Sequence, residues 1–138
     1  MKKLLVLGAG TAGTMIVNRL RRQLDAGEWS ITVVDPYDVH TYQPGFLFIP
    51  FGTYTPDQIT RPRRASLIKG VDFVMGEVDK VDAAANEVSL VDGKTLAYDY
   101  LIIASGTTPR PDQTPGMLGP EWRKSIFDFY TMDGAIAL

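Results

Sequence analysis

The sequence predicts an α/β fold that combines a parallel sheet, a crossover helix and an inserted antiparallel β-meander. Three observations predict it. An apolar strand at residues 3–7 leads directly into a glycine-rich turn and an amphipathic helix. A second apolar strand follows, which makes a βαβ unit with a right-handed crossover. Farther along, period-two sequence with a strong hairpin signal interrupts this pattern.

The first turn carries the pattern G-x-G-x-x-G in Gly8, Gly10 and Gly13. Gly8 allows a sharp turn, Gly10 lets the backbone approach a diphosphate, and Gly13 permits close packing of helix against strand. The free N–H groups and the dipole of the helix N-terminus would bind that diphosphate. Any glycine turn before a helix can match the pattern, but a strand before it and a helix after it favour dinucleotide binding.

The first helix is predicted over residues 11–24, with Gly27 as its C-terminal stop. Its apolar face follows the i, i+3, i+4 spacing expected of an amphipathic helix. That face comprises Ala12, Met15, Ile16, Leu20 and Leu24. The polar side chains that we expect to point to solvent are Asn18, Arg19, Arg21, Arg22 and Gln23.

Asp35 ends the second predicted strand, residues 29–35, about 20 residues beyond the glycine turn. A carboxylate at this place hydrogen-bonds the adenosine ribose hydroxyls in dinucleotide folds. The alternative is an ordinary turn residue at a strand end. Pro36 and Tyr37 follow, and no arginine stands beside them to accept a 2′-phosphate, which argues against NADP.

Residues 36–56 are predicted to form a long loop rich in aromatic residues and proline, and such loops are usually functional. A capping box at residues 55–58 predicts a short helix that Pro62 interrupts, and residues 63–69 predict a further turn or two. The basic cluster that follows is expected to be a solvated face, with phosphate or anionic-lipid contact as the alternative. The cluster comprises Arg61, Arg63, Arg64 and Lys69.

The pattern changes to period two at residue 71. Strands are predicted at residues 71–75, 77–81, 87–91 and 94–97, and Asp92-Gly93 predicts a hairpin turn before the last of them. Residues 98–104 predict another buried strand, which leads into Ser105-Gly106. This second glycine turn would lie beside the first, where open α/β sheets bind ligands. The alternative is an ordinary tight turn.

The remaining tail is proline-rich and extended up to a helix cap at residues 131–133. Its aromatic residues are expected to pack in a core or a domain interface; they are Trp122, Phe127, Phe129 and Tyr130. One apolar turn follows the cap, and a buried helix rarely consists of one turn. We therefore expect residues 1–138 to be part of a longer protein.

Composition limits the function. The chain has 138 residues, 45% of them apolar and 22% charged, with a formal net charge of −2, so it predicts a globular domain and no nucleic-acid partner. It contains no cysteine, which excludes a disulfide framework and a cysteine-ligated metal within it, and we predict no metal site. No run approaches the length of a membrane span, so the expected compartment is the cytoplasm, with peripheral membrane contact left open.

Several of these segments together resemble a known family. The G-A-G-T-A-G turn, the acid at residue 35, the meander and residues 98–106 are similar to the N-terminal FAD-binding part of the two-dinucleotide-binding-domain flavoproteins. Residues 35–52 and Phe129-Tyr130-Thr131 look most like the branch of sulfide:quinone oxidoreductase and flavocytochrome c sulfide dehydrogenase. The resemblance makes residues 1–138 one Rossmann-like FAD/NAD(P)-binding domain, about the first third of such an enzyme.

The resemblance implies an FAD-dependent oxidoreductase that passes electrons from a small, sulfide-like donor through FAD to a quinone or a cytochrome. It implies that the diphosphate is bound by the first turn, the ribose by the acid, the adenine by the backbone of residue 78, and the flavin by residues near 44 and 105. The implied cofactor-binding residues are Gly8, Gly10, Thr11, Ala12, Gly13, Asp35, Pro44, Val78, Ala104, Ser105 and Gly106. No catalytic residue is assigned.

Other functions stay open. Sulfide oxidisers of this kind use cysteines near the flavin, and this chain has none. The alternatives are a type II NADH:quinone reductase or another pyridine-nucleotide-dependent flavoprotein, and a non-catalytic nucleotide-binding fragment. His40, the only histidine, is either a proton-transfer group near the flavin or a solvated loop residue. The aromatic loop lines a flavin or quinone pocket or packs its own side chains. Uncovered apolar edges predict a homodimer.

Overall fold

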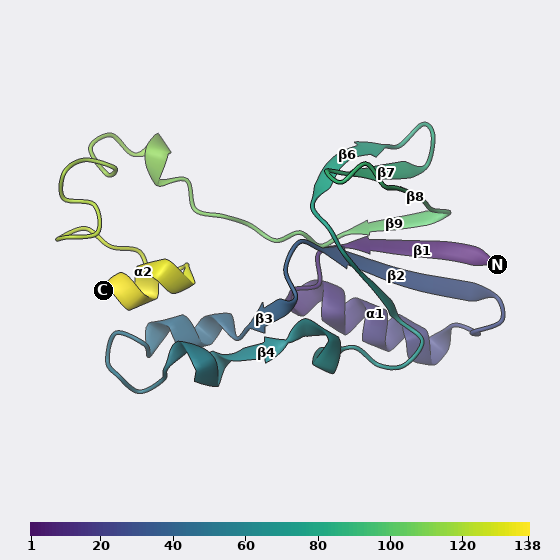
Figure 1. Cartoon of the computed structure of the whole chain (residues 1–138), viewed down its shortest axis with the longest axis horizontal. Helices are drawn as coiled ribbons and strands as arrows, with labels where there is room; N and C mark the ends of the chain where they lie inside the picture. Colours follow the sequence, from purple (N-terminus) through teal and green to yellow (C-terminus); the bar gives the residue numbers. More distant parts are fainter. The chain divides into compact units, whose positions relative to one another are not determined.

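The computed structural model describes all residues 1–138 and divides them into two compact units (Figure 1). Unit 1 comprises Met1–His40 and Pro62–Gly106, and unit 2 comprises Thr41–Arg61 and Thr107–Leu138. Each unit therefore draws its residues from two separate stretches of the chain.

Unit 1 is built on a four-stranded parallel sheet in the order β5-β2-β1-β9. The strands are β1 (Lys2–Leu7), β2 (Trp29–Asp35), β5 (Asp72–Met75) and β9 (Tyr100–Ile103). Leu4 of β1 pairs with Ile31 of β2 on one side and with Tyr100 of β9 on the other. A central parallel strand is buried on both faces, which is why β1 is a continuous apolar run. The predicted first and second strands are confirmed.

The two faces of this sheet are covered differently, as Figure 1 shows. Helix α1 (Thr11–Gln23) packs on one face, where Leu4 and Val6 of β1 join Val17 of the helix in one core cluster. A three-stranded antiparallel meander covers the other face, where Leu5 and Leu7 join a second cluster. The alternating side chains of β1 therefore serve two cores.

The meander consists of β6 (Val78–Asp82), β7 (Glu87–Leu90) and β8 (Thr95–Ala97). Gly93 has a φ of 87° in the turn between β7 and β8, as the predicted Asp-Gly hairpin requires. Strand β5 was expected to open this meander, but it pairs in parallel with β2 at the edge of the main sheet. Periodicity alone cannot say which partner a four-residue strand chooses.

Helix α1 has the predicted extent within one residue, but its buried face is only partly the predicted one. Leu20 and Leu24 pack against the core as expected. Gly13 and Val17 are buried, whereas Ala12 is exposed and Met15 is 66% exposed. Asn18, expected to face solvent, is half-buried and bonds to the chain at Ser66 and Ile68. The close packing of Gly13 against the glycine turn brings the Gly13–Val17 side of the helix onto the sheet.

Unit 2 is smaller and made of short helices. They are the 3₁₀ helices η1 (Gln43–Leu47), η2 (Pro56–Ile59) and η4 (Pro111–Gln113), and the α-helix α2 (Met132–Ala137). Phe46, Ile59 and Ala135 form its buried cluster. The predicted capping box is confirmed, since Thr55 N–H donates to Gln58 Oε1 at 2.8 Å. The predicted cap of α2 is also confirmed, since Gly134 N–H donates to Thr131 Oγ1 at 3.0 Å.

The predicted loop at residues 36–56 contains more regular structure than expected. Strand β3 (Val39–Thr41) pairs with β4 (Thr60–Pro62), and η1 follows β3. A fourth 3₁₀ helix, η3 (Arg63–Ser66), confirms the turn predicted after Pro62. None of the helices combines the length and the apolar character that crossing a membrane requires.

Candidate dinucleotide-binding site

The glycine turn between β1 and α1 lies directly against the second turn, after β9. Gly8 has a φ of 94°, and a Cβ added there would collide with the carbonyl oxygen of Ala104. The N–H of Ala104 donates to Leu7 O at 2.7 Å, and the N–H of Gly8 donates to Val34 O at 2.7 Å. The structure therefore brings the two predicted turns together at the carboxyl ends of three neighbouring strands, as expected.

The other two glycines differ in what surrounds them. A Cβ added at Gly13 would collide with the carbonyl oxygen of Gly8, so Gly13 is needed for the helix to approach the turn. A Cβ added at Gly10 would meet no atom within 4 Å. No side chain caps α1 at Gly10, and its first turn contains no acidic residue. Free helix N–H groups beside open space fit the diphosphate of a dinucleotide such as FAD.

Asp35 lies at the end of β2, next to this turn, and is only 8% exposed. Its Oδ2 accepts the N–H of Ala9 at 2.8 Å, and its Oδ1 accepts the N–H of Tyr37 at 3.0 Å. A carboxylate oxygen can accept two hydrogen bonds, so Oδ2 keeps capacity for a further donor such as a ribose hydroxyl. Asp35 therefore lies at the turn and also stabilises it through its hydrogen bond with Ala9.

Arg63, expected to belong to a solvated face, is only 7% exposed. Its Nη2 lies 3.2 Å from Asp35 Oδ1, a contact that the residues next to Asp35 in the sequence do not indicate. The guanidinium additionally donates to the carbonyl oxygens of Ala9, Tyr37 and Val39. Sequence spacing carried no signal for this residue, because its partners lie far away in the chain and η3 is too short to show a periodicity.

The remaining predicted site residues are distributed over both units. Thr11 and Ala12 are exposed in the first turn of α1, and Ser105 and Gly106 are exposed after β9. Val78 begins β6, where it pairs with Leu90 and is half-buried. Pro44 belongs to unit 2, where it lies in the first turn of η1. His40 is half-buried in β3.

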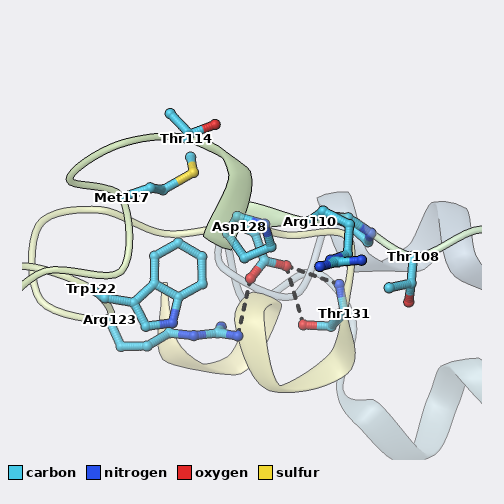
Figure 2. A pocket seen from close by; sticks show the side chains of 10 residues that line it. Thr108, Arg110, Thr114, Met117, Trp122, Arg123, Asp128 and Thr131 are labelled. Atoms are coloured by element: carbon cyan, nitrogen blue, oxygen red, sulfur yellow. Dashed lines mark hydrogen bonds and ion pairs between the residues drawn. The ribbon is translucent and has the colours of Figure 1, made fainter.

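Unit 2 has a pocket of its own, of about 380 Å³, which none of the predicted cofactor-binding residues lines (Figure 2). Trp122 and Met117 supply apolar surface, and Arg123 stacks its guanidinium 5.0 Å from the Trp122 ring centre. Arg123 Nη2 lies 3.0 Å from Asp128 Oδ2, while Asp128 Oδ1 accepts bonds from the backbone and the hydroxyl of Thr131. Arg123 and Asp128 are thus paired within the pocket, whereas Arg110, which also lines it, is paired with Asp112.

The aromatic residues of unit 2 differ in exposure. Trp122 and Phe127 are half-buried, whereas Phe129 and Tyr130 are exposed, so this last pair lies outside the core of unit 2. The Tyr130 hydroxyl lies 2.9 Å from Oγ1 of Thr107, and Thr107 directly follows the second turn in the sequence. Hydrogen bonds from Thr107 and then Gln43 hold the pKa of Tyr130 below its ordinary value, because they stabilise the phenolate.

Comparisons with known proteins agree with this geometry. Over 131 residues the chain is 24% identical to the mitochondrial sulfide:quinone oxidoreductase of Dictyostelium discoideum, covering 95% of this chain and 29% of that protein. Over 107 residues it is 34% identical to the type II NADH:quinone oxidoreductase of Staphylococcus saprophyticus, covering 76% of this chain and 26% of that protein. The chain therefore spans less than a third of the length of these curated relatives.

Solved structures share the fold. The sulfide:quinone oxidoreductase of Aquifex aeolicus superimposes with a TM-score of 0.80 at 24% identity, covering 99% of this chain and 30% of that one. The model of the family described as pyridine nucleotide-disulphide oxidoreductase matches residues 2–136. These findings confirm the Rossmann-like α/β fold and the resemblance identified in the sequence. The chain belongs to the pyridine nucleotide-disulphide oxidoreductase family, the FAD-dependent oxidoreductases.

Proposed function

We propose that this chain is the FAD-binding part of an enzyme that passes electrons from a small, sulfide-like donor through FAD to a quinone or a cytochrome. The observation that carries the proposal is the contact between the two glycine turns, with Asp35 held against the first of them. When bound, FAD accepts two electrons from the donor and delivers them to the acceptor.

In this proposal the chain binds and orients the cofactor. Gly8 and Gly13 shape the turn, Gly10 leaves room for the diphosphate, and the N–H groups of Thr11 and Ala12 bind it at the helix N-terminus. Asp35 accepts a hydrogen bond from the ribose through Oδ2. The backbone at Val78 contacts the adenine. The turn of Ala104, Ser105 and Gly106 lies toward the flavin end, and Pro44 is proposed as a further flavin-binding residue.

One match over the whole chain supports the sulfide branch. The sulfide:quinone oxidoreductase of Dictyostelium discoideum matches 95% of this chain, including unit 2, whereas that of Mus musculus matches 75% and the type II NADH:quinone oxidoreductase matches 76%. The higher identity over the shorter match, 34%, supports the NADH-oxidising enzyme as the second candidate. Residues 1–138 contain no cysteine, so in either case they supply no redox-active thiol.

The test is an anaerobic reduction of the purified, full protein. We expect visible flavin absorbance, bleaching of that absorbance by sulfide, and recovery when a soluble quinone is added. Bleaching by NADH but not by sulfide would favour the NADH:quinone reductase. A colourless protein that gains no flavin spectrum with added FAD would contradict both and leave a non-catalytic nucleotide-binding module. We further propose a homodimer and peripheral contact with a membrane, where a quinone would be met.

A further inference from the structure

Asp35 and Arg63 are the two charged residues of the chain that are buried, and they contact one another. The Nη2 atom of Arg63 lies 3.2 Å from Asp35 Oδ1, and both side chains are about nine-tenths buried. Burying a charge is costly unless it is paired and hydrogen-bonded. Because this pair lies at the glycine turn, the contacts of Arg63 define its role there.

Each nitrogen of the Arg63 guanidinium has an acceptor. Nε donates to Tyr37 O at 2.8 Å, Nη1 donates to Ala9 O, and Nη2 donates to Val39 O at 2.9 Å as well as facing Asp35. Ala9 belongs to the glycine turn, and the other two carbonyls lie just beyond β2. One side chain thus ties the turn to the segment that follows the acid. Because these donors are taken, Arg63 is poorly suited to bind a cofactor phosphate itself.

The carboxylate that Arg63 faces is very near the proposed diphosphate site. Asp35 Oδ2 is 2.8 Å from the N–H of Ala9, which stands between Gly8 and Gly10. An unpaired carboxylate there would repel a diphosphate, and repulsion between partly buried charges is weakly screened by salt. With Arg63 in place, the pair is neutral and its carboxylate has one fixed orientation.

We propose that Arg63 is a positioning residue of the dinucleotide site: it neutralises Asp35 and fixes it against the glycine turn, so that a diphosphate can bind beside a carboxylate. This inference rests on the proposed placement of the dinucleotide at that turn. Arg63 contacts the acid and the turn backbone, and it acts on the cofactor through them.

The first test measures FAD binding by the full protein after removal of bound flavin. Arg63→Met should weaken FAD binding by about tenfold or more, which corresponds to about 1.4 kcal/mol. Adding Asp35→Asn to Arg63→Met should recover part of that loss, because the amide carries no charge, although it can accept only one of the two backbone N–H bonds that the carboxylate accepts. Arg61→Met is the matched control, since Arg61 is exposed and bonds only to carbonyls of its own segment. Strictly additive effects of the two substitutions would overturn the proposal.

A second readout separates electrostatic positioning from general damage to the fold. In Arg63→Met, the uncovered carboxylate should disfavour a ligand that carries phosphate, and salt screens a buried charge only weakly. The same variant should therefore lose more affinity for ADP than for uncharged adenosine. Equal losses for the two ligands would show a purely structural residue and overturn the proposal.

Arg63→Lys keeps the test decisive if Arg63→Met does not fold. Lysine retains the charge but cannot reach the three carbonyls with one compact ammonium group. We expect Arg63→Lys to unfold at a lower temperature yet to keep the unmodified protein's ratio of ADP affinity to adenosine affinity. An Arg63→Lys variant that loses affinity for ADP but not for adenosine would contradict the proposal.

Gly10→Ala separates this inference from the proposed function. If Gly10→Ala loses FAD while Arg63→Met binds it normally, the dinucleotide is where we place it and only the role of Arg63 fails. If Gly10→Ala binds FAD as tightly as the unmodified protein, the placement itself fails.

Discussion

The Oδ2 atom of Asp35 accepts the backbone N–H of Ala9 at 2.8 Å, from a residue 26 positions earlier in the chain. This bond joins the end of β2 to the turn between β1 and α1. It gives Asp35 a structural role besides the ribose contact that the sequence predicts, because a buried N–H without a partner is costly.

Removing the carboxylate of Asp35 should therefore destabilise the protein. Asp35→Ala leaves the N–H of Ala9 without its acceptor and Arg63 buried without its counter-ion, so we expect a loss of about 3–5 kcal/mol in the free energy of unfolding. Denaturant titration followed by circular dichroism measures it. Asp72→Ala, an exposed aspartate of the edge strand β5, is the control and should change stability by less than about 1 kcal/mol. Equal effects of the two substitutions would refute the structural role.

Alanine substitution at two glycines of the same turn should have different effects, on stability at Gly13 and on FAD binding at Gly10. Gly13→Ala places a methyl group against the carbonyl of Gly8, so we expect the free energy of unfolding to fall by about 1–3 kcal/mol. Gly10→Ala meets open space and should change it by less than about 1 kcal/mol, yet weaken FAD binding by about tenfold or more. Thermal unfolding and flavin fluorescence separate the two effects. A stable Gly13→Ala variant would show that the turn is looser than described.

Asn18 of α1 should matter for stability although its position predicts exposure. Its Nδ2 donates to Ser66 O at 2.7 Å, and its Oδ1 accepts the N–H of Ile68 at 3.1 Å. Asn18→Ala leaves both backbone groups without these partners, so we expect a loss of about 1–3 kcal/mol in a denaturant titration. Arg19→Ala, next to it and exposed, should cost less than about 0.5 kcal/mol.

Tyr130 should ionise at a lower pH than an ordinary tyrosine. Its pKa is held below 10.0 first by the hydrogen bond from Thr107 and then by that from Gln43, both of which stabilise the phenolate. Thr107→Val removes the first bond, so the pKa should rise toward the ordinary value. An NMR titration of protein labelled with ¹³C at the tyrosine ring resolves the residue, and Tyr130→Phe assigns its signal. A Tyr130 pKa unchanged by Thr107→Val would refute the assignment of cause.

Strand β9 should drive the proposed self-association. It is an edge of the parallel sheet, and its Tyr100 and Ile103 are 51% and 65% exposed. An uncovered apolar edge strand pairs readily with another chain, and a lysine on it discourages that pairing. Light scattering should show residues 1–138 as a dimer of the 15.2 kDa chain and the Ile103→Lys variant as a monomer. A monomeric unmodified chain would contradict the prediction.

The elements that were predicted correctly are those whose signal is local. Strand β2 occupies the predicted residues, and the Asp-Gly hairpin and the capping box at Thr55 form where expected. Each depends on a few adjacent residues, such as a turn that favours a positive φ or a cap whose partner stands three residues away. The glycine turn belongs to the same class.

By itself, the sequence determined the βαβ unit, the glycine turn and the family to which the chain belongs, because these follow from periodicity and from spacing within a short window. Only the tertiary structure decided which side of α1 is buried, that β5 joins the parallel sheet, and that Arg63 lies against Asp35. Each depends on which distant segments come together. Arg63 in particular has the sequence context of a surface arginine, and the backbone carbonyls that surround it are carried by residues of any type.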